Sequence, residues 1–332
     1  MSNWESLINL NRSDLEQMTD MEKFEEMIKR LDNLNVNGFV FDVKSEKGVL
    51  YSTKIGFTVD KTDIIEKLIE YSREFGYDSY LWLVALKEYT LNTEYREDFI
   101  NFISNFQLSK LGYSDKNYWQ IDKNGKIIDE QFICPTHEGY KQYLLEVVKE
   151  IVKLPIKGII ISDYWFDSEA CFCERCRQLI KRKIGVDLNK PITTKDFYLW
   201  INWKTEVISD FFKKCRDNIP RNLRLIGEII DIDPAYGYVV GYKINTGLDI
   251  SLSKYCDEVI FHIAPISGVD DESLKVITDI ARYLIGSLDK EIILFFELSE
   301  KKIINTAEKM AEKCEVSRIL YYLPSIEEFK KL

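Results

Sequence analysis

Three cysteines lie within six positions of the stretch ACFCERCRQ, residues 170–178. Cys173 and Cys176 are three residues apart at the expected start of a helix over 173–185, so their thiols share one helical face, and Cys171 directly precedes them. Thiolates bind zinc at about 2.3 Å, and the free N–H groups of a helix N-terminus favour negative sulfur. This spacing predicts a metal site with three thiolate ligands.

A fourth ligand is needed to close a tetrahedral zinc site, and Cys134 is the best candidate. It ends a short predicted strand, QFIC (131–134), next to the strand that precedes the cysteine cluster, so two adjacent loops would meet. His137 lies close enough in the sequence to replace it. A site closed by four cysteines is structural, because no position remains for a catalytic water. The alternatives are free thiols, a disulfide with one spare thiol, and an iron–sulfur cluster.

Carboxyl groups at predicted strand ends could perform acid–base chemistry. Asp163 lies near the end of the strand KGIIISDYW (157–165), and Glu297 lies near the end of EIILFFEL (291–298). Reactions that need a proton donor and a second, ionised group use two such carboxyls in different surroundings, and one of them must be protonated. Asp163 and Glu297 are candidates for such a pair. The alternative is structural: Asp163 caps the following loop and Glu297 pairs with a lysine.

Other side chains at predicted strand ends could hold a substrate, because aromatic rings suit the C–H faces of sugars and polar groups bind hydroxyls. The expected substrate-binding residues are Asp42, Trp165, Glu228, His262 and Tyr322. Glu228, Asp231 and Asp233 could instead bind a divalent cation or be solvated carboxylates, and His262 could be a core histidine. Only one of Tyr321 and Tyr322 can point inward. Lys44, directly before the exposed loop SEKG (45–48), and His137 are expected at the surface. The remaining cysteines are expected to be buried thiols: Cys215, Cys256 and Cys314.

Apolar runs of strand length alternate with helix-period segments and must position these residues. Strands are predicted at 36–43, 79–86, 131–134, 157–165, 224–231, 258–263, 291–298 and 318–323. Helices are predicted at 62–76, 136–154, 173–185, 195–218, 271–284 and 301–313. Continuously apolar strands indicate a parallel sheet covered on both faces, and about eight strand–helix units are typical of a (β/α)₈ TIM barrel.

No linker divides the chain, so a single domain over 1–332 is expected, with a cysteine-rich loop and helix inserted after the fourth strand at about 167–190. An open doubly wound sheet is the alternative fold. The chain has no G-x-G-x-x-G after its first predicted strand, which weakens the dinucleotide-binding form of that fold.

The overall charge of the chain indicates which classes of binding partner are unfavourable. The 45 basic and 55 acidic residues give a net charge of −10, which argues against nucleic acid or an anionic membrane. The start MSNWESLINLNRSD lacks the apolar stretch of a signal peptide, and no run approaches the ~18 apolar residues of a membrane span, so a cytoplasmic protein is expected. The Trp- and Phe-rich segment 195–218 could pack on a second subunit, which makes a homo-oligomer a candidate.

The segments ICPTHEGYKQYLLEVVKEIV, KGIIISDYWFD and CFCERCRQLIK occur in this order, and together they resemble the catalytic domain of the family 42 beta-galactosidases. FVFDVKSEKGVLYS and YWQIDKNGKI resemble related glycosyl-hydrolase-like barrels. The similarity covers most of the first 190 residues loosely and 133–182 most specifically.

This resemblance implies a (β/α)₈ barrel, an acid/base carboxylate closing the fourth strand and a nucleophile closing the seventh. It also implies zinc bound by four cysteines: Cys134, Cys171, Cys173 and Cys176. Counting strands independently puts Asp163 on the fourth and Glu297 on the seventh. The fourth strand departs from the family pattern, reading Ser162-Asp163 where the family has Asn-Glu, so galactoside specificity does not carry over.

The expected function is therefore cleavage of a glycosidic bond in a carbohydrate substrate by Asp163 and Glu297, with a structural zinc ion. One alternative is a non-catalytic carbohydrate-binding or scaffold barrel with structural zinc. Another is a metal-dependent hydrolase or isomerase built on Asp42, Glu228, Asp231 and His262. The presence of only two histidines in the chain counts against it.

Overall fold

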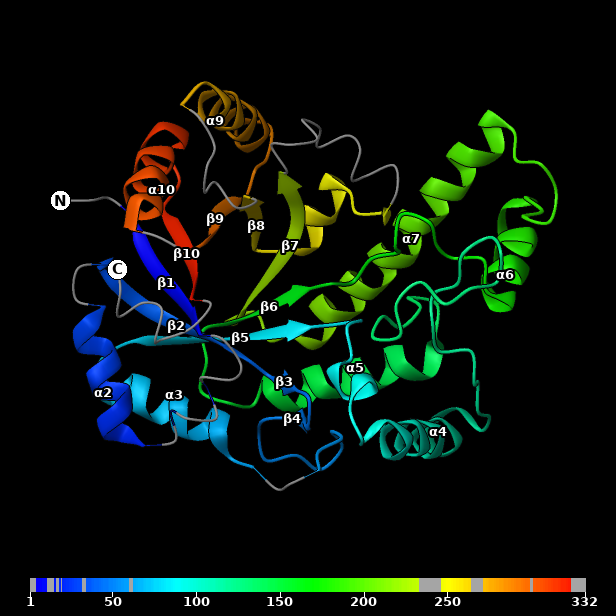
Figure 1. Ribbon diagram of the computed structural model, residues 1–332, viewed down its shortest axis with the longest axis horizontal. Coiled ribbons are helices and arrows are strands. Elements are labelled where there is room, and N and C mark those ends of the chain that lie inside the picture. Colours follow the sequence, from blue (N-terminus) through cyan, green and yellow to red (C-terminus); the bar gives the residue numbers. More distant parts are fainter. Residues whose placement is uncertain are drawn as a thin grey trace.

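Within the described residues, eight parallel strands close into a barrel (Figure 1). The computed structural model describes residues 4–10, 15, 18, 20–31, 34–59, 62–232, 246–263, 271–298 and 301–323, without the side chains of 229–232, 271, 273, 284 and 301. In order around the barrel, the strands are β1 (Glu5–Leu10), β2 (Val36–Asp42), β5 (Asp78–Val84), β6 (Gly158–Ser162), β7 (Arg224–Ile232), β8 (Glu258–Ile263), β9 (Glu291–Glu297) and β10 (Arg318–Leu323). This closure confirms the predicted TIM barrel and excludes the open doubly wound sheet.

Helices follow most of the strands and cover the barrel. They are α2 (Met21–Arg30), α3 (Ile64–Glu74), α4 (Arg96–Leu111), α5 (Glu138–Ile151), α6 (Glu174–Ile184), α7 (Thr194–Asn218), α9 (Asp271–Gly286) and α10 (Lys301–Cys314). The described connections include a small hairpin, β3 (Lys44–Ser45) and β4 (Gly48–Val49), and the 3₁₀ turns η2 (Tyr89–Asn92) and η3 (Ile250–Tyr255). Figure 1 shows α6 and the first part of α7 extending away from the barrel. No helix in these described ranges is long and apolar enough to cross a membrane.

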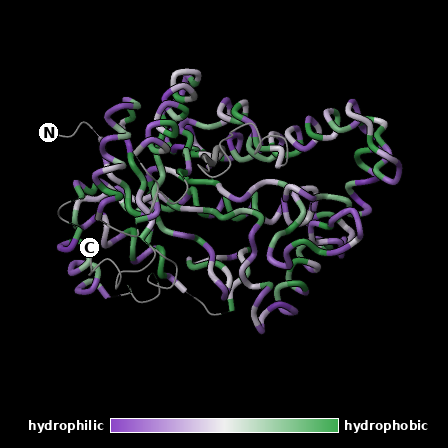
Figure 2. Tube along the Cα trace, turned by 45° about the horizontal axis from the view of Figure 1, so that its top comes forward, coloured by the Kyte–Doolittle hydropathy of each residue, from purple (hydrophilic) through white to green (hydrophobic). Residues whose placement is uncertain are grey.

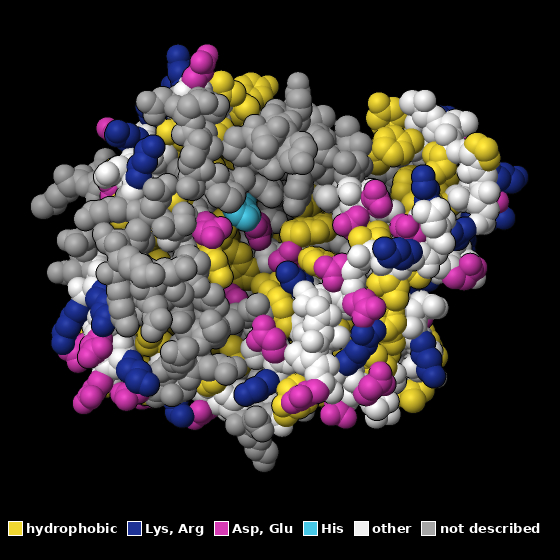
Figure 3. Space-filling view, in the orientation of Figure 1, with side chains coloured by type: hydrophobic (Ala, Val, Ile, Leu, Met, Phe, Trp, Pro, Cys, Tyr) yellow, Lys and Arg dark blue, Asp and Glu magenta, His cyan; other side chains and the backbone are white. Residues whose placement is uncertain are grey.

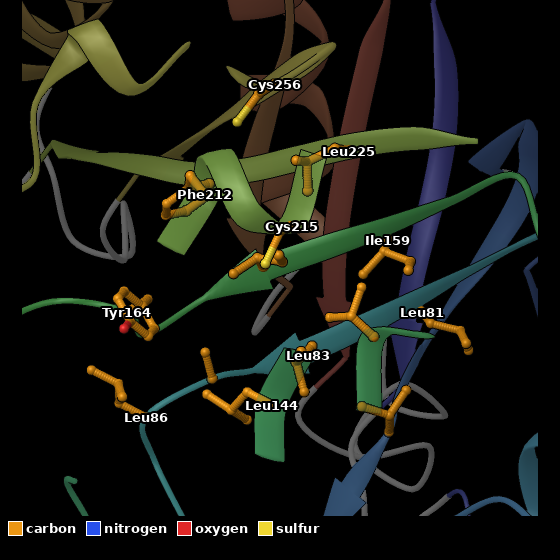
Figure 4. Close-up of a cluster of buried hydrophobic side chains, with 14 of the residues drawn as sticks. Leu81, Leu83, Leu86, Leu144, Ile159, Tyr164, Phe212, Cys215, Leu225 and Cys256 are labelled. Atoms are coloured by element: carbon orange, nitrogen blue, oxygen red, sulfur yellow. The ribbon is translucent and has the colours of Figure 1, made fainter. Parts of the chain in front are cut away.

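The barrel strands are apolar on both faces, as predicted. One set of side chains fills the interior: Leu7, Val40, Tyr80, Trp82, Val84, Ile160, Ile226, Ile260, Ile293, Phe295 and Leu320. The alternate residues, such as Leu81, Leu83 and Ile159, belong to a second core between the strands and the helices, together with Leu144 of α5 and Phe212 of α7 (Figure 4). Figure 2 accordingly shows hydrophobic colouring on the strands and hydrophilic positions along the outer helices. Side chains at alternate positions of one strand therefore belong to different cores.

One predicted strand is not part of the barrel and one barrel strand was not predicted, so the predicted number of strands is still correct. The segment 131–134 is not a barrel strand, since Phe132 and Ile133 make only isolated bridges to Lys87 and Trp119. The first barrel strand is instead β1, which pairs with β2 and β10 and buries the polar residues Ser6 and Asn9. These polar residues interrupt the apolar run ESLINL and hide the strand in the sequence. Because one strand is gained and one is lost before β6, β6 remains the fourth strand and β9 the seventh.

A buried carboxylate closes the amino-terminal end of the barrel. The side chain of Glu258 on β8 is only 1% exposed and pairs with Arg224 on β7 and with Arg318 on β10, whose Nη1 lies 2.6 Å from both carboxylate oxygens. Arg318 also donates to Glu5 at 2.9 Å, so the network joins β1, β10, β8 and β7. Hydrogen bonding to Glu258 raises the pKa of Arg318 above its usual value despite burial.

We expect Glu258→Gln to lower the free energy of unfolding by about 3–5 kcal/mol, because it leaves Arg318 buried without its main counter-charge. Chemical denaturation followed by circular dichroism measures this change. Glu291→Gln is the matched control, since Glu291 contacts the same Arg224 at 3.2 Å but its side chain is 59% exposed. The control should cost less than about 1 kcal/mol. If both variants lost the same free energy of unfolding, Glu258 would not be the main counter-charge of the buried Arg318.

Candidate functional site

The polar side chains singled out in the sequence continue the inward rows of the barrel at its carboxyl-terminal end. Each lies two positions after an interior residue of its strand: Asp42 after Val40, Glu228 after Ile226, His262 after Ile260, Glu297 after Phe295 and Tyr322 after Leu320. Alternation along a strand directs these side chains to the same mouth. Tyr321 belongs to the outer core, so Tyr322 is the inward member of that pair. Figure 3 shows the surface hollowed between the barrel and the α6–α7 projection, with acidic and hydrophobic side chains on its wall.

Asp163 reaches the mouth by a different route. Strand β6 ends at Ser162, whose inward hydroxyl accepts a hydrogen bond from Trp82 Nε1 at 2.6 Å and donates to Asp163 Oδ2 at 3.3 Å. Strict alternation would send residue 163 away from the interior, but Asp163 has φ = 52°, a left-handed conformation that Asp tolerates better than most residues. Its carbonyl accepts from the N–H of Leu86 at 3.1 Å, which holds the turn. The predicted strand 157–165 therefore ends three residues early, and this end re-aims the carboxyl group.

The electrostatic surroundings of Asp163 favour its protonated form. Burial, followed by the negative charge of Glu228, raises the pKa of Asp163 to about 7, while Lys87, the Ser162 hydroxyl and Lys44 act in the opposite direction. Glu228 itself contacts His262, whose Nδ1 lies 3.1 Å from Glu228 Oε1. The His262 side chain is 31% exposed and the Glu228 side chain is 13% exposed. An acid that is protonated near neutral pH is suited to donating a proton to a leaving group.

Aromatic contacts connect the other predicted residues around the mouth. The His262 ring meets Phe295 edge-on with centroids 4.5 Å apart, and Phe295 also contacts Trp82 at 5.5 Å and Tyr322 at 6.5 Å. Tyr322 is in register with Glu297 on the adjacent strand. Histidine 262 is thus a mouth residue, partly exposed, rather than a core histidine.

On the neighbouring side of the mouth, Asn9 Nδ2 donates to Asp42 Oδ1 at 3.3 Å. The structure therefore brings the predicted strand-end residues to one end of the barrel. Asp163 and Glu297 lie on strands separated by β7 and β8. The side chains of Asp231 and Asp233, candidates for a cation site, lie outside the described part of the structure.

Trp165 lies beyond β6 in a group of partly exposed aromatic residues. Its ring stacks on Phe132 with centroids 6.2 Å apart, and Lys87 Nζ lies 5.7 Å from the Phe132 centroid. Buried Gln120 fixes the loop, since its Nε2 donates to the Trp165 carbonyl at 3.1 Å and its Oε1 accepts from Asp167 N at 2.8 Å. The sequence singled out Trp165 but not Phe132, because Phe132 was assigned to a barrel strand that does not exist.

Two residues expected at the surface are buried. Lys44 is held by the β3–β4 hairpin and its Nζ donates to the carbonyls of Ala85 (3.2 Å) and Lys87 (2.9 Å), to Glu88 Oε2 (3.2 Å) and to Tyr140 Oη (3.1 Å). His137 is the N-cap of α5, where its Nδ1 accepts from Tyr140 N at 3.0 Å, and burial lowers its pKa to about 4. Both expectations are wrong because a polar loop sequence does not show which of its polar groups find partners inside the protein.

The four predicted metal-binding cysteines come together. The Sγ atoms of Cys134, Cys171, Cys173 and Cys176 lie within 4.8 Å of one another, all four residues are buried, and none is in a disulfide. From Cys134 Sγ, the distances to the other three sulfurs are 3.5, 4.0 and 3.5 Å. Four sulfurs about 2.3 Å from one zinc ion would be about 3.8 Å apart, so the donor set fits a tetrahedral metal.

The local structure around these cysteines explains how they meet. Cys173 is the N-cap of α6, and its Sγ accepts from Cys176 N at 3.4 Å. Cys134 approaches from the loop before α5, with its N–H bonded to the Tyr118 carbonyl at 2.7 Å, rather than from a strand end. His137 is not part of this group, while the other three cysteines are buried and separate, as expected: Cys215, Cys256 and Cys314.

Comparisons with solved structures find similar barrels at low identity. A complexed GH113 beta-1,4-mannanase covers 98% of this chain and 89% of its own, with a TM-score of 0.48 and 8% identity. The endo-fucoidan hydrolase P5AFcnA of glycoside hydrolase family 107 covers 100% and 90%, with a TM-score of 0.49 and 9% identity. The glycoside hydrolase domain of PelA from Pseudomonas aeruginosa covers 98% and 97%, with a TM-score of 0.44 and 10% identity. At these TM-scores we draw no argument about activity from them.

The sequence itself carries a more specific relationship. Curated proteins provide no match. A comparison with protein families, however, matches residues 6–221 to one described as Glycosyl hydrolase-like 10. This segment runs from within β1 to just beyond α7 and includes Asp163 and all four clustered cysteines. It confirms the resemblance to glycosyl-hydrolase-like barrels, although the matched family is not family 42. The matched segment spans well over half of the chain, which therefore belongs to the Glycosyl hydrolase-like 10 family.

Proposed function

We propose that the protein hydrolyses a glycosidic bond in a carbohydrate, with Asp163 as the proton donor and Glu297 as the second carboxylate. The observation that carries this proposal is the position of Asp163, which a left-handed turn directs to the barrel mouth beside Glu228. Membership in a glycosyl-hydrolase-like family supports a carbohydrate as the substrate. The inward position of Glu297 on β9 supports its role as the partner.

In the proposed reaction, Asp163 gives its proton to the glycosidic oxygen as the bond from that oxygen to the anomeric carbon breaks. In the same step the anomeric carbon is attacked from its opposite face. Glu297 either forms the new bond itself, as a nucleophile at a carboxyl separation of about 5 Å, or acts as a base that activates the attacking water at about 6.5–9.5 Å. Water supplies the hydroxyl group of the new reducing end. Trp165 and Tyr322 would pack on sugar faces, while polar groups would hold sugar hydroxyls: Asp42, Glu228 and His262.

The test is a screen for release of reducing sugars from plant, fungal, algal and bacterial polysaccharides and their oligosaccharides, with Asp163→Asn as the background control. Turnover that is absent from the variant supports the proposal, and the anomeric configuration of the first product, read by NMR, reports retention or inversion. Saturable sugar binding without turnover would favour the alternative, a carbohydrate-binding barrel.

We also propose that the four clustered cysteines hold a structural zinc ion. Four sulfur ligands leave no open coordination position, so the ion would join the loop before α5 to the start of α6 and brace the connection that carries Trp165. Such a thiolate centre persists in a reducing compartment, which supports a cytoplasmic location. Metal analysis of protein purified without chelator should find about one zinc per chain, and chelation should lower the melting temperature. Protein with no bound metal and an unchanged melting temperature would refute this part of the proposal.

The fall of kcat/KM on the basic side of its pH profile (the basic limb) should move in opposite directions in two variants. Wild-type kcat/KM is expected to fall as the pH rises through about 7, because Asp163 loses the proton that it must donate. Glu228→Gln removes a negative charge that favours the protonated acid, so the basic limb should move to lower pH. Lys87→Met removes a positive charge that opposes protonation, so the limb should move to higher pH. Full pH profiles of both variants measure this; shifts in the same direction would show that Asp163 does not set the limb.

A further inference from the structure

A threonine hydroxyl lies between two sulfur atoms of the cysteine cluster. Thr136 Oγ1 is 3.2 Å from Cys134 Sγ and 3.3 Å from Cys176 Sγ, and Thr136 is 6% exposed. Thr136 shares the loop before α5 with Cys134, whereas Cys176 lies on α6, so the hydroxyl contacts both segments that form the cluster. A hydroxyl has one hydrogen to donate and two lone pairs that accept, so its orientation depends on its remaining neighbour.

That remaining neighbour is the guanidinium group of Arg175. Arg175 Nε lies 3.0 Å from Thr136 Oγ1. An arginine can only donate in such a contact, so the Thr136 oxygen accepts, and its own hydrogen is left for a sulfur atom of the cluster. Groups that hydrogen bond to metal ligands orient those ligands and change the affinity for the metal. Arg175 and Thr136 therefore form a chain of hydrogen bonds that ends at the sulfur atoms.

The rest of the Arg175 side chain is fixed by the connection between α4 and α5. Its Nη1 pairs with the carboxylate of Asp115, and its Nη2 donates to the Asn117 carbonyl at 2.8 Å. Asp115 is itself held by two buried residues, since its N–H donates to Gln107 Oε1 at 2.8 Å and its carbonyl oxygen lies 3.0 Å from His137 Nε2. These contacts fix the plane of the guanidinium group, so its Nε–H stays directed at the hydroxyl.

From these contacts we propose that Arg175 and Thr136 strengthen metal binding by the four cysteines: Arg175 holds the Thr136 oxygen as an acceptor, and Thr136 thereby donates its hydrogen to the sulfur of Cys134 or Cys176. This inference rests on the proposed metal site. A hydrogen bond to a thiolate disperses part of the negative charge that the ligands place in the protein interior. Both are positioning residues, because they act through the ligand sulfurs and take no part in the reaction at the barrel mouth.

The first experiment compares zinc affinity in Thr136→Val and Thr136→Ser. Valine has the shape of threonine without the hydroxyl, whereas serine keeps the hydroxyl. Metal-free proteins, prepared under reducing conditions, are titrated with zinc against a competing chelator. Thr136→Val should bind zinc about 10–100-fold more weakly than wild type, and Thr136→Ser should bind it as tightly as wild type. An unchanged affinity in Thr136→Val, or an equal loss in Thr136→Ser, would overturn the inference.

Cobalt(II) in place of zinc reports the hydrogen bond to sulfur directly. The charge-transfer bands from thiolate to cobalt(II) in the near ultraviolet should move to longer wavelength in Thr136→Val, because a sulfur that loses a hydrogen bond gives up an electron more easily. Thr136→Ser should keep the wild-type bands. Bands that stay at the wild-type wavelength in Thr136→Val would show that the hydroxyl does not donate to a ligand sulfur, and the inference would fail.

A double-variant cycle tests whether Arg175 acts through Thr136. Arg175→Met should weaken zinc binding in the wild-type background but have no further effect in Thr136→Val, because the hydroxyl that it orients is absent there. Equal losses in the two backgrounds would show that Arg175 acts independently of the hydroxyl, contrary to the inference. Arg182→Met is the matched control, since Arg182 is exposed on the same helix, and its loss should leave the zinc affinity unchanged.

A crystal structure of the zinc-loaded wild type covers the case in which the variants fail to fold. Thr136 Oγ1 should contact the sulfur of Cys134 or Cys176 and also Arg175 Nε. A hydroxyl turned away from both sulfurs would overturn the inference. Wild-type protein that binds no zinc would refute the proposed metal site itself, whereas zinc binding that is unaltered in Thr136→Val would refute only the role given to Thr136 and Arg175.

Discussion

Asp163→Asn is expected to lower kcat on unactivated glycosides by about 10²–10⁴-fold, the usual contribution of a general acid or base. The substitution keeps the size of the side chain, and Asn tolerates the left-handed conformation at φ = 52° as well as Asp does. Because burial and the negative charge of Glu228 raise the pKa of Asp163 to about 7, its ionised form costs stability at neutral pH, and a neutral amide should leave the melting temperature equal to or higher than that of the wild type. Steady-state kinetics and thermal denaturation of the same preparation measure both effects.

The leaving group distinguishes an acid from a merely structural residue. A dinitrophenolate departs without protonation, so Asp163→Asn should lose little of the bond-breaking step on a dinitrophenyl glycoside and much more on an oligosaccharide. Glu297→Gln should lower bond cleavage on both substrates, because the opposite-face group is needed whatever the leaving group. Equal losses of Asp163→Asn on the two substrates would argue against its role as the acid, and unaltered turnover in Glu297→Gln would remove Glu297 from the pair.

The second large effect is on stability, at the ion pair between Lys44 and Glu88. Both side chains are 1% exposed, and Glu88 also accepts hydrogen bonds from Tyr140 Oη at 2.9 Å and Thr90 Oγ1 at 3.0 Å. Glu88→Gln leaves the Lys44 ammonium group buried without its counter-charge, and we expect the free energy of unfolding to fall by about 3–5 kcal/mol. Urea denaturation measures this loss. The comparison requires that the free energy of unfolding depends on urea concentration with the same slope in each variant.

A double variant tests the cause of that loss. Lys44→Met combined with Glu88→Gln removes the stranded charge, so it should recover part of the stability lost in Glu88→Gln alone. The ion pair also holds the backbone of Lys87, the residue whose charge acts on Asp163. Glu88→Gln should therefore disturb the pH profile as well. A double variant that is less stable than either single variant would show that packing, rather than uncompensated charge, sets the cost.

The parts of the fold that depend on local pattern could be predicted from the sequence. Apolar runs such as KGIIISDYW identify the strands because both faces of each strand are buried, and the period of α5 to α10 identifies most helices. The spacing of Cys171, Cys173 and Cys176 predicted a cluster because a helix start necessarily brings such thiols together. Strand β1 was missed because Ser6 and Asn9 are polar and yet buried, which no local pattern reveals.

By itself, the sequence determined the barrel and the strands that carry Asp163 and Glu297, because these follow from hydrophobic periodicity. It also determined that Cys171, Cys173 and Cys176 gather at one helix start, because their spacing places them there. Only the tertiary structure decided that Cys134 joins them from a separate loop, the direction of the Asp163 carboxyl, the pairing of Glu228 with His262, and the burial of Lys44 and His137. Those features depend on contacts between segments far apart in the chain, where the cost of burying a polar group is set by the partners that it meets.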